Sequence, residues 1–446
     1  MKLANENPYY LDSLNLIVKD LVVSGNEITK DEIILREMTL KKGSKFRLEK
    51  YTNDILRIYN LGLFTKVDII PVPVSGKDIM LNVDVQERWY IFPLPQAGIE
   101  DGEWAKKWVG MNIVWENFRG RNETALLSFK ILYNPFIKIS YSVPWIGEKI
   151  HLFSTISGSY SKTRNKSLAA IGKSSGNETI KEDEKNYDNY QFKSQLTTGK
   201  FLSRRFAVFS DLGYDYIRVS EYASGRTLSP TGKDKYLKLG LGFQYDSRNI
   251  LEFATKGYFL KTSYLRYGFL DELINFGRFD FESQNFIPIH LKKNYFITIA
   301  SKLYTSLSVG AVIPVYNHEY LGYSEDFVRG WKGIAFEGEN VLTLYDEIRI
   351  PIIQPQYIKA KNIALVRDMP ILKRLDLKYG LFFTIIYDVG TVWNKNDNIF
   401  KVKFLNGTGI GLNAILPFGY IFRTEWTFRL GKPTVGQFGI SLSAKF

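Results

Sequence analysis

The chain ends with the run Gln437-Phe438-Gly439-Ile440-Ser441-Leu442-Ser443-Ala444-Lys445-Phe446, in which small or polar residues alternate strictly with apolar ones. A period of two is the spacing of a β-strand that has one apolar and one polar face. Such a strand fits the wall of a membrane barrel, because its apolar side chains face lipid and its polar ones face the lumen. A soluble sandwich also alternates, so this run alone leaves both architectures open.

The same alternation continues upstream and predicts about sixteen strands, most of them long enough to cross a bilayer at a tilt. Trp residues such as Trp108, Trp145 and Trp426 stand near the proposed strand ends, as in the interfacial girdles of membrane barrels. The aromatic positions therefore favour the barrel. The predicted strands are 87–100, 108–117, 122–133, 136–146, 149–160, 188–200, 205–219, 235–247, 256–268, 276–288, 293–305, 340–351, 379–391, 405–415, 420–430 and 436–446.

The connections between these strands alternate in length. The segments 161–186, 220–234 and 312–339 each follow an odd-numbered strand and are long, whereas most connections after even-numbered strands are short. Long loops on one side and tight turns on the other are typical of outer-membrane barrels. The connection 352–378 breaks the pattern, either because it hides further elements or because it is an insertion. We leave open whether that insertion lies on lipid head groups or is solvated.

The first 88 residues have a different pattern. After an extension of residues 1–14, the segment 15–88 predicts a strand, two helices and two more strands, a small α+β domain with one core. Thr29 and Glu32 have the spacing of a capping box at the start of the first helix. Gly62 is placed to end the second helix. The remaining segment, 89–446, is the predicted barrel.

The composition excludes several classes of protein. With no Cys and only three dispersed His, the sequence predicts no disulfide scaffold, no metal site and no cofactor. The net charge of +13 has no dense basic block, which argues against nucleic acid and suits acidic lipid head groups. No motif for a nucleophile or a phosphate loop is present, so we predict no enzyme and no catalytic residues.

Neither a transmembrane helix nor a signal peptide is visible. No apolar run reaches about 18 residues, the length that a membrane-spanning helix needs. Residues 1–11 lack the apolar core of a signal peptide. If the protein is exported, its signal is missing from this sequence.

The run Val328-Arg329-Gly330-Trp331 lies in the long segment 312–339 and precedes two acidic strand residues, Glu347 and Asp388. A carboxylate inside an apolar strand must face a polar lumen or be paired. Arg329 would satisfy both carboxylates with its planar fork if the loop 312–339 folds into the barrel. The alternative is an ordinary loop arginine that pairs with Glu325.

These residues resemble a known family, the BamA outer-membrane assembly superfamily. The resemblance is carried by Val328-Arg329-Gly330-Trp331, by Asp246-Ser247-Arg248-Asn249 at a strand end, by Tyr387-Asp388-Val389-Gly390 and by the terminal Phe446. It implies that Arg329 is the family's conserved loop arginine and that Glu347 and Asp388 are its partners in the barrel wall. The strand-end residues Asp246, Arg248 and Asn249 belong to the same pattern.

The N-terminal domain resembles the family's polypeptide-transport-associated (POTRA) module. The similarity lies in Gly25-Asn26, Gly43, Gly62-Leu63-Phe64 and Val85-Gln86-Glu87. Members of the superfamily that assemble proteins usually carry several such modules, but this chain has room for one. The usual docking of accessory proteins is therefore in doubt.

A second candidate site is the seam between the first and last strands. Pro93 and Pro95 remove two N–H donors from the first strand, and Gly436 and Gly439 weaken the last, which also holds Phe446. A weak seam would act as a lateral gate at which an incoming strand pairs by β-augmentation. Alternatively, both prolines precede the strand and lie in a linker.

The sequence therefore predicts a 16-stranded antiparallel transmembrane β-barrel (all-β) behind one α+β domain of βααββ order. We expect a non-enzymatic insertase or translocase in the outer membrane, with the POTRA-like domain in the periplasm. Its partners would be unfolded outer-membrane or secreted protein clients, outer-membrane lipids or lipopolysaccharide, and periplasmic accessory proteins, but no nucleic acid. The alternatives are a two-partner-secretion pore and a soluble all-β binding protein.

Overall fold

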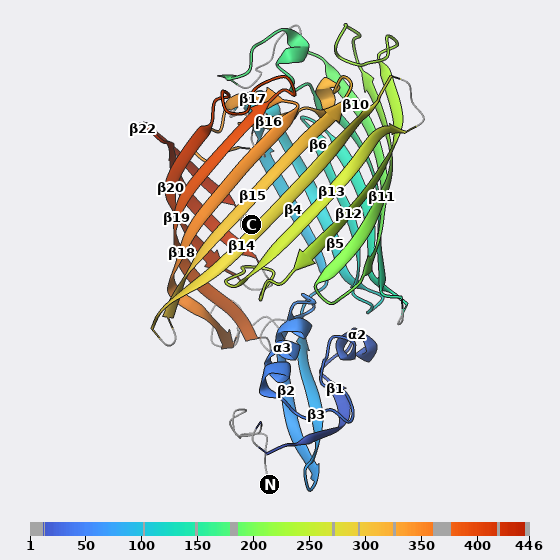
Figure 1. Cartoon of the computed structure of the whole chain (residues 1–446), viewed down its shortest axis with the longest axis vertical. Helices are drawn as coiled ribbons and strands as arrows, with labels where there is room; N and C mark the ends of the chain where they lie inside the picture. The colour runs from blue at the N-terminus through green and yellow to red at the C-terminus, as the bar shows by residue number, and fades with distance from the viewer. Residues whose placement is uncertain are drawn as a thin grey trace.

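The chain folds into a small N-terminal domain that lies below a large barrel (Figure 1). The structure is a computed structural model. It describes residues 12, 14–100, 103–147, 150–178, 186–269, 273–292, 295–323, 327–359, 376–416 and 420–441. We call the end of the barrel nearer the N-terminal domain the domain-side rim and the opposite end the far rim.

The N-terminal domain is a three-stranded sheet packed against two helices. Strand β3 lies in the centre, parallel to β1 and antiparallel to β2, so β1 and β2 are the two edges. Apolar side chains of the helices and strands, among them Ile34, Ile58 and Leu81, are fully buried between the layers. The elements are β1 (Ile17–Ser24), α2 (Asp31–Leu35), α3 (Leu48–Tyr59), β2 (Phe64–Ser75) and β3 (Asp78–Glu87). The predicted βααββ order is confirmed.

The predicted capping box at Thr29 is wrong. Helix α2 starts at Asp31, and its N-cap residue Lys30 makes no side-chain cap. Thr29 binds a different residue instead, because both its hydroxyl and its backbone N–H donate to the carboxylate of Glu87 at the end of β3. A tertiary contact has replaced the local one that the sequence pattern indicated.

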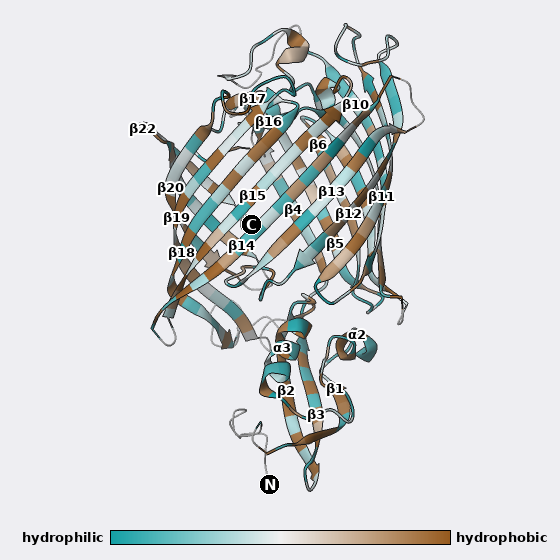
Figure 2. Ribbon diagram, viewed as in Figure 1, coloured by the Kyte–Doolittle hydropathy of each residue, from teal (hydrophilic) through white to brown (hydrophobic). Residues whose placement is uncertain are grey.

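The barrel is a single antiparallel sheet of sixteen strands, which run in chain order from β4 to β22. The predicted number of strands is confirmed. Figure 2 shows apolar and polar residues alternating along them, as the pattern of period two requires. The strands are β4 (Ile91–Ile99), β5 (Lys107–Phe118), β6 (Glu123–Leu132), β7 (Phe136–Ile146), β8 (Leu152–Arg164), β10 (Asp188–Phe201), β11 (Phe206–Val219), β12 (Lys233–Asp246), β13 (Gly257–Phe269), β14 (Phe276–Lys292), β15 (Tyr295–Gly310), β18 (Asn340–Lys359), β19 (Asp376–Trp393), β20 (Leu405–Ile415), β21 (Ile421–Arg429) and β22 (Lys432–Ser441).

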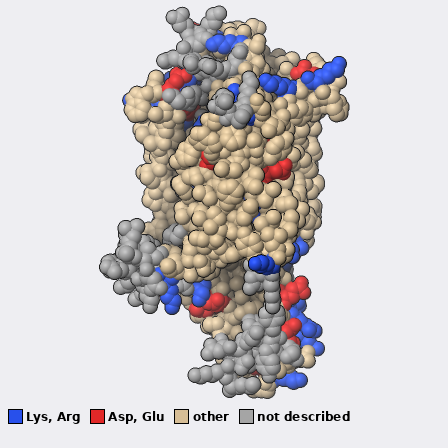
Figure 3. Space-filling model, turned by 90° about the vertical axis from the view of Figure 1, so that its left-hand side faces the viewer, with Lys and Arg blue, Asp and Glu red and all other residues tan. Residues whose placement is uncertain are grey.

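The outer surface of the barrel is an apolar band. Large hydrophobic side chains such as Ile139, Leu241 and Phe438 are more than half exposed. Figure 3 shows few charged side chains on this band, whereas Lys and Arg side chains are grouped towards its two ends. Exposed apolar area of this extent requires a non-aqueous surrounding or a partner. Within the described residues, no helix is long and apolar enough to cross a membrane.

Two connections differ from their predicted form. The segment 352–378 is not wholly a connection, because β18 continues to Lys359 and β19 begins at Asp376. Proline interrupted the alternation there, and the pairing of β18 with β19 shifts register on both sides of Ile353. The segment 312–339 contains β16 (Glu319–Leu321) and β17 (Ile334–Gly338). In a small sheet, β17 pairs with β16 on one side and with β9 (Asn177–Glu178) on the other.

Candidate functional site

Arg329 lies inside the barrel, where it is 1% exposed. Its Nε and Nη2 donate to the two carboxylate oxygens of Asp388 on β19, at 2.7 and 2.6 Å. Its Nη1 donates to Glu347 on β18 at 2.8 Å. The structure thus brings together the three residues that the sequence paired. The alternative partner, Glu325, lies outside the described residues.

Three more charged side chains join this group, and sequence reasoning missed them. Glu425 on β21 accepts a second bond from Arg329 Nη1 at 2.8 Å, Arg349 on β18 is 2.9 Å from Glu347, and Arg423 on β21 is 3.2 Å from Glu425. The signal was present, because Arg423 and Glu425 share one face of a predicted strand. We call these six residues the arginine cluster: Arg329, Arg349, Arg423, Glu347, Asp388 and Glu425.

The cluster contains three cations and three anions, so its formal charge is zero. Buried ions are tolerated when each has a partner with good hydrogen-bond geometry, whereas removal of one partner costs about 3–5 kcal/mol. Each carboxylate here lies within 3.5 Å of at least one guanidinium. The cluster therefore fastens the inward-folded loop to three different strands of the wall.

Glycine residues in the barrel wall leave room for the inward-folded loop. A Cβ at Gly407 on β20 would stand 1.8 Å from the carbonyl oxygen of Arg329. One at Gly390 on β19 would stand 2.5 Å from the side chain of Val328, which is fully buried. Gly330 itself has a φ of +91° and lies against the backbone of Phe428. Only glycine permits this approach and this backbone conformation.

The last residues of the run hold the loop against strands β20 to β22. Trp331 donates its indole N–H to the carbonyl of Asn406 at 2.9 Å, and the guanidinium of Arg429 lies 4.9 Å from the centre of its ring. The backbone of Lys332 makes two hydrogen bonds with the amide side chain of Gln437 on β22, at 3.2 and 2.8 Å. Loop and last strand are thus directly linked.

We expect Gln437→Leu to loosen the last strand. The change removes both hydrogen bonds to Lys332 while it keeps a side chain of similar size, and such bonds contribute roughly 0.5–1.5 kcal/mol each. Amide hydrogen exchange in β22 should be faster, and exchange in β14 should stay as in the unchanged protein. Gln191→Leu on β10 is the matched control. Equal exchange rates in the two variants would contradict a link between the loop and β22.

Among the described residues, the sheet is open at the seam between its first and last strands. Its order begins at β4 and ends at β22, and no ladder joins these two strands among the described residues. The carbonyl of Tyr90 accepts the N–H of Glu116 on β5, and the register after it is regular. Backbone groups alternate in direction along a strand, so Pro93 and Pro95 face the free edge. The reading that they precede the strand is wrong, since both lie within β4.

The other side of the seam is formed by β22. Gly436 lies against the ring of Trp426, where an added Cβ would be 2.6 Å from a ring carbon. An added Cβ at Gly439 would meet a single atom within 4 Å, a carboxylate oxygen of Glu425 at 4.0 Å. The predicted gate residue Phe446 lies outside the described residues. At the domain-side rim, the rings of Phe92 on β4 and Tyr420, just before β21, are in edge contact at 6.5 Å.

The strand-end residues Asp246, Arg248 and Asn249 lie apart from the arginine cluster and shape a turn at the domain-side rim. Arg248 binds both carboxylate oxygens of Asp246, at 3.0 and 2.6 Å. The Asn249 side chain accepts the backbone N–H groups of Thr255 and Lys256, both at 3.1 Å. These contacts close residues 247–256, the inward turn, into a compact loop.

The N-terminal domain is docked on this rim. Asn117, at the end of β5, donates to the hydroxyl of Thr29 at 2.8 Å, and the carbonyl of Gly120, in the turn that follows, accepts the N–H of Lys30 at 3.0 Å. Gly120 has a φ of +70°, and its Cβ position lies 2.1 Å from the carbonyl oxygen of Ile28. The domain is therefore held by backbone contacts that a larger residue would break.

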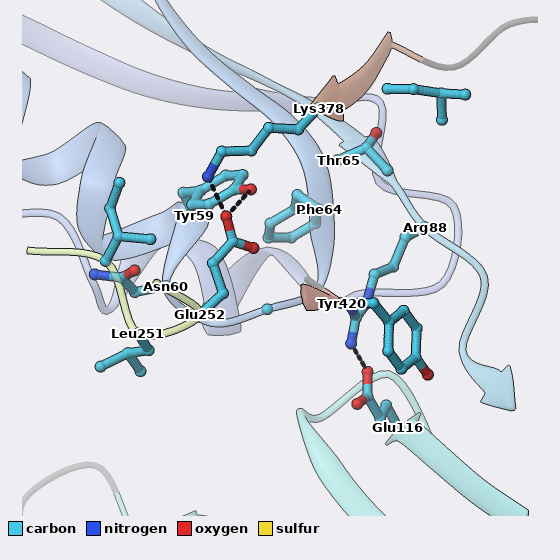
Figure 4. Close-up of a pocket in the computed structure, with 13 residues that line it drawn as sticks. Tyr59, Asn60, Phe64, Thr65, Arg88, Glu116, Leu251, Glu252, Lys378 and Tyr420 are labelled. Atoms are coloured by element: carbon cyan, nitrogen blue, oxygen red, sulfur yellow. Dashed lines mark hydrogen bonds and ion pairs between the residues drawn. The ribbon is translucent and has the colours of Figure 1, made fainter. Parts of the chain in front are cut away.

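A cavity of about 380 Å³ lies between the domain, the inward turn and the foot of the seam. Figure 4 shows Glu252 of the inward turn directed towards Tyr59 of α3 and Lys378 of β19, while Arg88 reaches Glu116 beside Tyr420. Burial and the Glu252 carboxylate raise the pKa of Tyr59 above its ordinary range, so Tyr59 is a neutral donor there.

No group of His, Cys, Asp and Glu side chains that could hold a metal ion is found in the part of the chain that the structure describes. His318 lies 2.7 Å from Glu337 at the far rim, and Ser167 donates to the same carboxylate at 2.6 Å. Burial opposes ionisation, but these hydrogen bonds hold the pKa of Glu337 below its usual range. The group ties the loop after β15 to the loop after β8.

Two family models match the chain. Residues 117–446 match the Omp85 superfamily domain, and residues 16–88 match POTRA, the surface antigen variable number repeat. Among curated proteins, the chain is 31% identical over 135 residues to a putative outer membrane protein assembly factor of Treponema pallidum (strain Nichols). It is 37% identical over 71 residues to the outer membrane protein assembly factor BamA of Neorickettsia risticii (strain Illinois). These matches cover 29% and 16% of this chain, but only 16% and 10% of the two relatives.

Solved structures extend the likeness to nearly the whole chain. BamA from Haemophilus ducreyi lacking POTRA domains 1–3 has 15% identity and a TM-score of 0.55 over 96% of this chain and 84% of that one. CdiB from Acinetobacter baumannii has 15% identity and a TM-score of 0.58 over 97% and 74%. CdiB from Escherichia coli has 12% identity and a TM-score of 0.61 over 96% and 75%. At these identities the likeness shows the fold alone.

Proposed function

The chain belongs to the Omp85 superfamily of outer-membrane proteins, which are not enzymes, and we propose that it inserts β-barrel proteins into the outer membrane. Polypeptide clients follow from the family. The proposal adds that they are barrel precursors and that they enter the membrane through the seam. No nucleotide is needed, because client folding and the burial of apolar side chains in lipid supply the free energy.

The observation that carries the proposal is the open seam. Strand β4 pairs with β5 along its whole length, and no described strand pairs with its other edge; β22 pairs with β21. A free edge is a template for a further strand. Because Pro93 and Pro95 remove donors from that edge, β4 is a poor permanent partner for β22, which favours a seam that opens.

In this proposal the chain divides as its sequence suggests: residues 15–88 form a periplasmic receiving domain and residues 89–446 the barrel. Both β1 and β2 are sheet edges, and either one offers backbone groups to an unfolded client. The arginine cluster holds the inward-folded loop and, through Lys332 and Gln437, one side of the gate. Lipids or lipopolysaccharide contact the outer band.

We expect a cross-link over the seam to stop assembly. The chain has no Cys, so Leu94→Cys on β4 and Ser441→Cys on β22, which both lie on the lumen face of their strands, would be the only thiols for a short bis-maleimide. Joining them should lower the rate of client insertion into liposomes to the rate that is measured without the protein. The control joins Asn285→Cys and Ser301→Cys, which are direct partners within the closed wall. Client insertion at the normal rate with a cross-linked seam would exclude a lateral gate.

A second candidate function is secretion of one polypeptide through the lumen of a barrel whose fold the CdiB structures share. It requires a continuous path, whereas the described residues place the Arg329 loop within the lumen. Steady ion conductance in planar bilayers, together with a neighbouring gene for a large secreted partner, would support the pore over the insertase.

A further inference from the structure

The inward turn, residues 247–256, enters the lumen from the domain-side rim. Its Phe253 is 3% exposed and packs with Phe382, Ile415 and Ile421, which belong to β19, β20 and β21. These strands stand four to seven places along the sheet from β12 and β13, the strands that carry the turn. A buried aromatic ring that joins these separate parts of the wall narrows the lumen at its level, and we call this ring the stopper.

The top of the turn is held by the arginine cluster. Arg349 Nη1 donates to the carbonyl of Ala254 at 3.3 Å, and its guanidinium lies 4.3 Å from the centre of the Phe253 ring. Arg349 also binds Glu347, which binds Arg329. One guanidinium thus contacts both the turn that enters from below and the carboxylate that fixes the loop from above.

The bottom of the turn is held by the N-terminal domain. The Glu252 carboxylate accepts the hydroxyl of Tyr59 and pairs with Lys378, as Figure 4 shows. The Asn60 side chain, at the end of α3, donates to the carbonyl of Asn249 at 2.9 Å. Phe253 and Glu252 are neighbours in sequence, so the stopper and the docking contact cannot move independently over more than a short distance.

We propose that the inward turn is a gate of the lumen that couples docking of the N-terminal domain to the arginine cluster. When the domain leaves the rim, Glu252 loses Tyr59 and Asn249 loses Asn60, the turn withdraws Phe253, and Arg349 keeps its contact with Glu347. Coupling of this kind is reciprocal, so withdrawal of Phe253 also loosens the domain. The inference goes beyond the proposed function, because it concerns the protein without any client.

The test uses two reporters in the full-length, Cys-free chain. Thr298 on β15 is 1% exposed and pairs with Arg349 in the ladder, so Thr298→Cys reports access of a water-soluble maleimide to the lumen behind the turn. Spin labels at Lys50→Cys on α3 and Leu202→Cys in the turn after β10 report the position of the domain on the rim. Neither reporter requires assembly of a client.

Phe253→Ala should raise the rate of maleimide reaction at position 298 several-fold and broaden the distance distribution between the spin labels. Glu252→Gln, on the domain side, should produce both changes as well. Leu251→Ala is the matched control, because Leu251 belongs to the same turn but is 48% exposed. Should Phe253→Ala fail to give a heat-modifiable folded band, Phe253→Leu keeps the apolar contact and removes the ring beneath Arg349.

The outcomes separate the gate from its coupling. If Phe253 variants leave the reaction at position 298 unchanged, the turn is no gate and the proposal is overturned. If they expose position 298 while the spin-label distances stay narrow, or if Glu252→Gln changes neither reporter, the coupling is overturned. Normal responses of both reporters in a protein that inserts no client would contradict only the proposed function.

Discussion

Arg329→Ala is expected to give a barrel that unfolds at a clearly lower temperature and assembles clients poorly. The substitution removes four side-chain hydrogen bonds to Asp388, Glu347 and Glu425. Asp388 is fully buried and would be left with the backbone N–H of residue 329 as its remaining described donor. Breaking a buried ion pair in this way costs about 3–5 kcal/mol.

The measurement is the temperature at which the compact, heat-modifiable band on a gel is lost. The Arg329→Lys protein should lose this band at a temperature between those of the unchanged protein and the Arg329→Ala protein. An ammonium group keeps the charge but cannot form the planar fork on Asp388. Arg205→Ala, at an exposed position in the turn after β10, is the control for loss of a single positive charge. An Arg329→Ala protein with unchanged heat resistance and normal client assembly would show that the cluster has no role in either property.

Sequence reasoning identified Arg329, Glu347 and Asp388 but missed Glu425, Arg423 and Arg349. Alternation tells which face of a strand a residue occupies, but not which residue of a distant strand stands opposite it. Arg329 and Glu425 are 96 residues apart and meet only because the loop crosses the lumen. The sequence therefore indicated that Asp388 needs a charged partner, but it did not identify the other members of the cluster.

The strand count was predictable for a related reason. Each strand shows its own period of two, and the sheet joins consecutive strands almost everywhere, so local patterns and topology agree. The failures are at places where a non-local contact replaces a local one. Thr29 bonds to Glu87 instead of capping α2, and the proline-containing end of β18 is strand despite its irregular pattern.

The inward turn was missed because nothing in its sequence requires burial. Asp246, Arg248 and Asn249 have the composition of an exposed turn, and Phe253 alone could have been a lipid-facing residue. Its direction is set by Gly257, which has a φ of +103° and a Cβ position 2.3 Å from the carbonyl oxygen of Ser247. The sequence does not distinguish a glycine with a positive φ that directs the chain into the lumen from any other turn glycine.

Gly407→Ala should displace the Arg329 loop although it adds a single methyl group. The new Cβ would stand 1.8 Å from the carbonyl oxygen of Arg329 and 3.5 Å from the Val328 side chain. Strand β20 pairs on both sides and cannot yield without breaking its ladders. The loop must therefore move, and with it the fork on Asp388, so the loss of stability should approach that of Arg329→Ala.

Accessibility of position 328 measures this displacement directly. Val328 is fully buried, so a Val328→Cys thiol should react slowly with maleimide in the otherwise unchanged chain and much faster once Gly407→Ala is added. Gly158→Ala is the matched control, because it also adds a methyl group to a strand glycine but meets no atom within 4 Å. If both alanine variants react at the slow rate, the loop does not depend on the bare backbone of β20. Fast reaction with Gly407→Ala alone would show that one strand glycine admits the loop to the lumen.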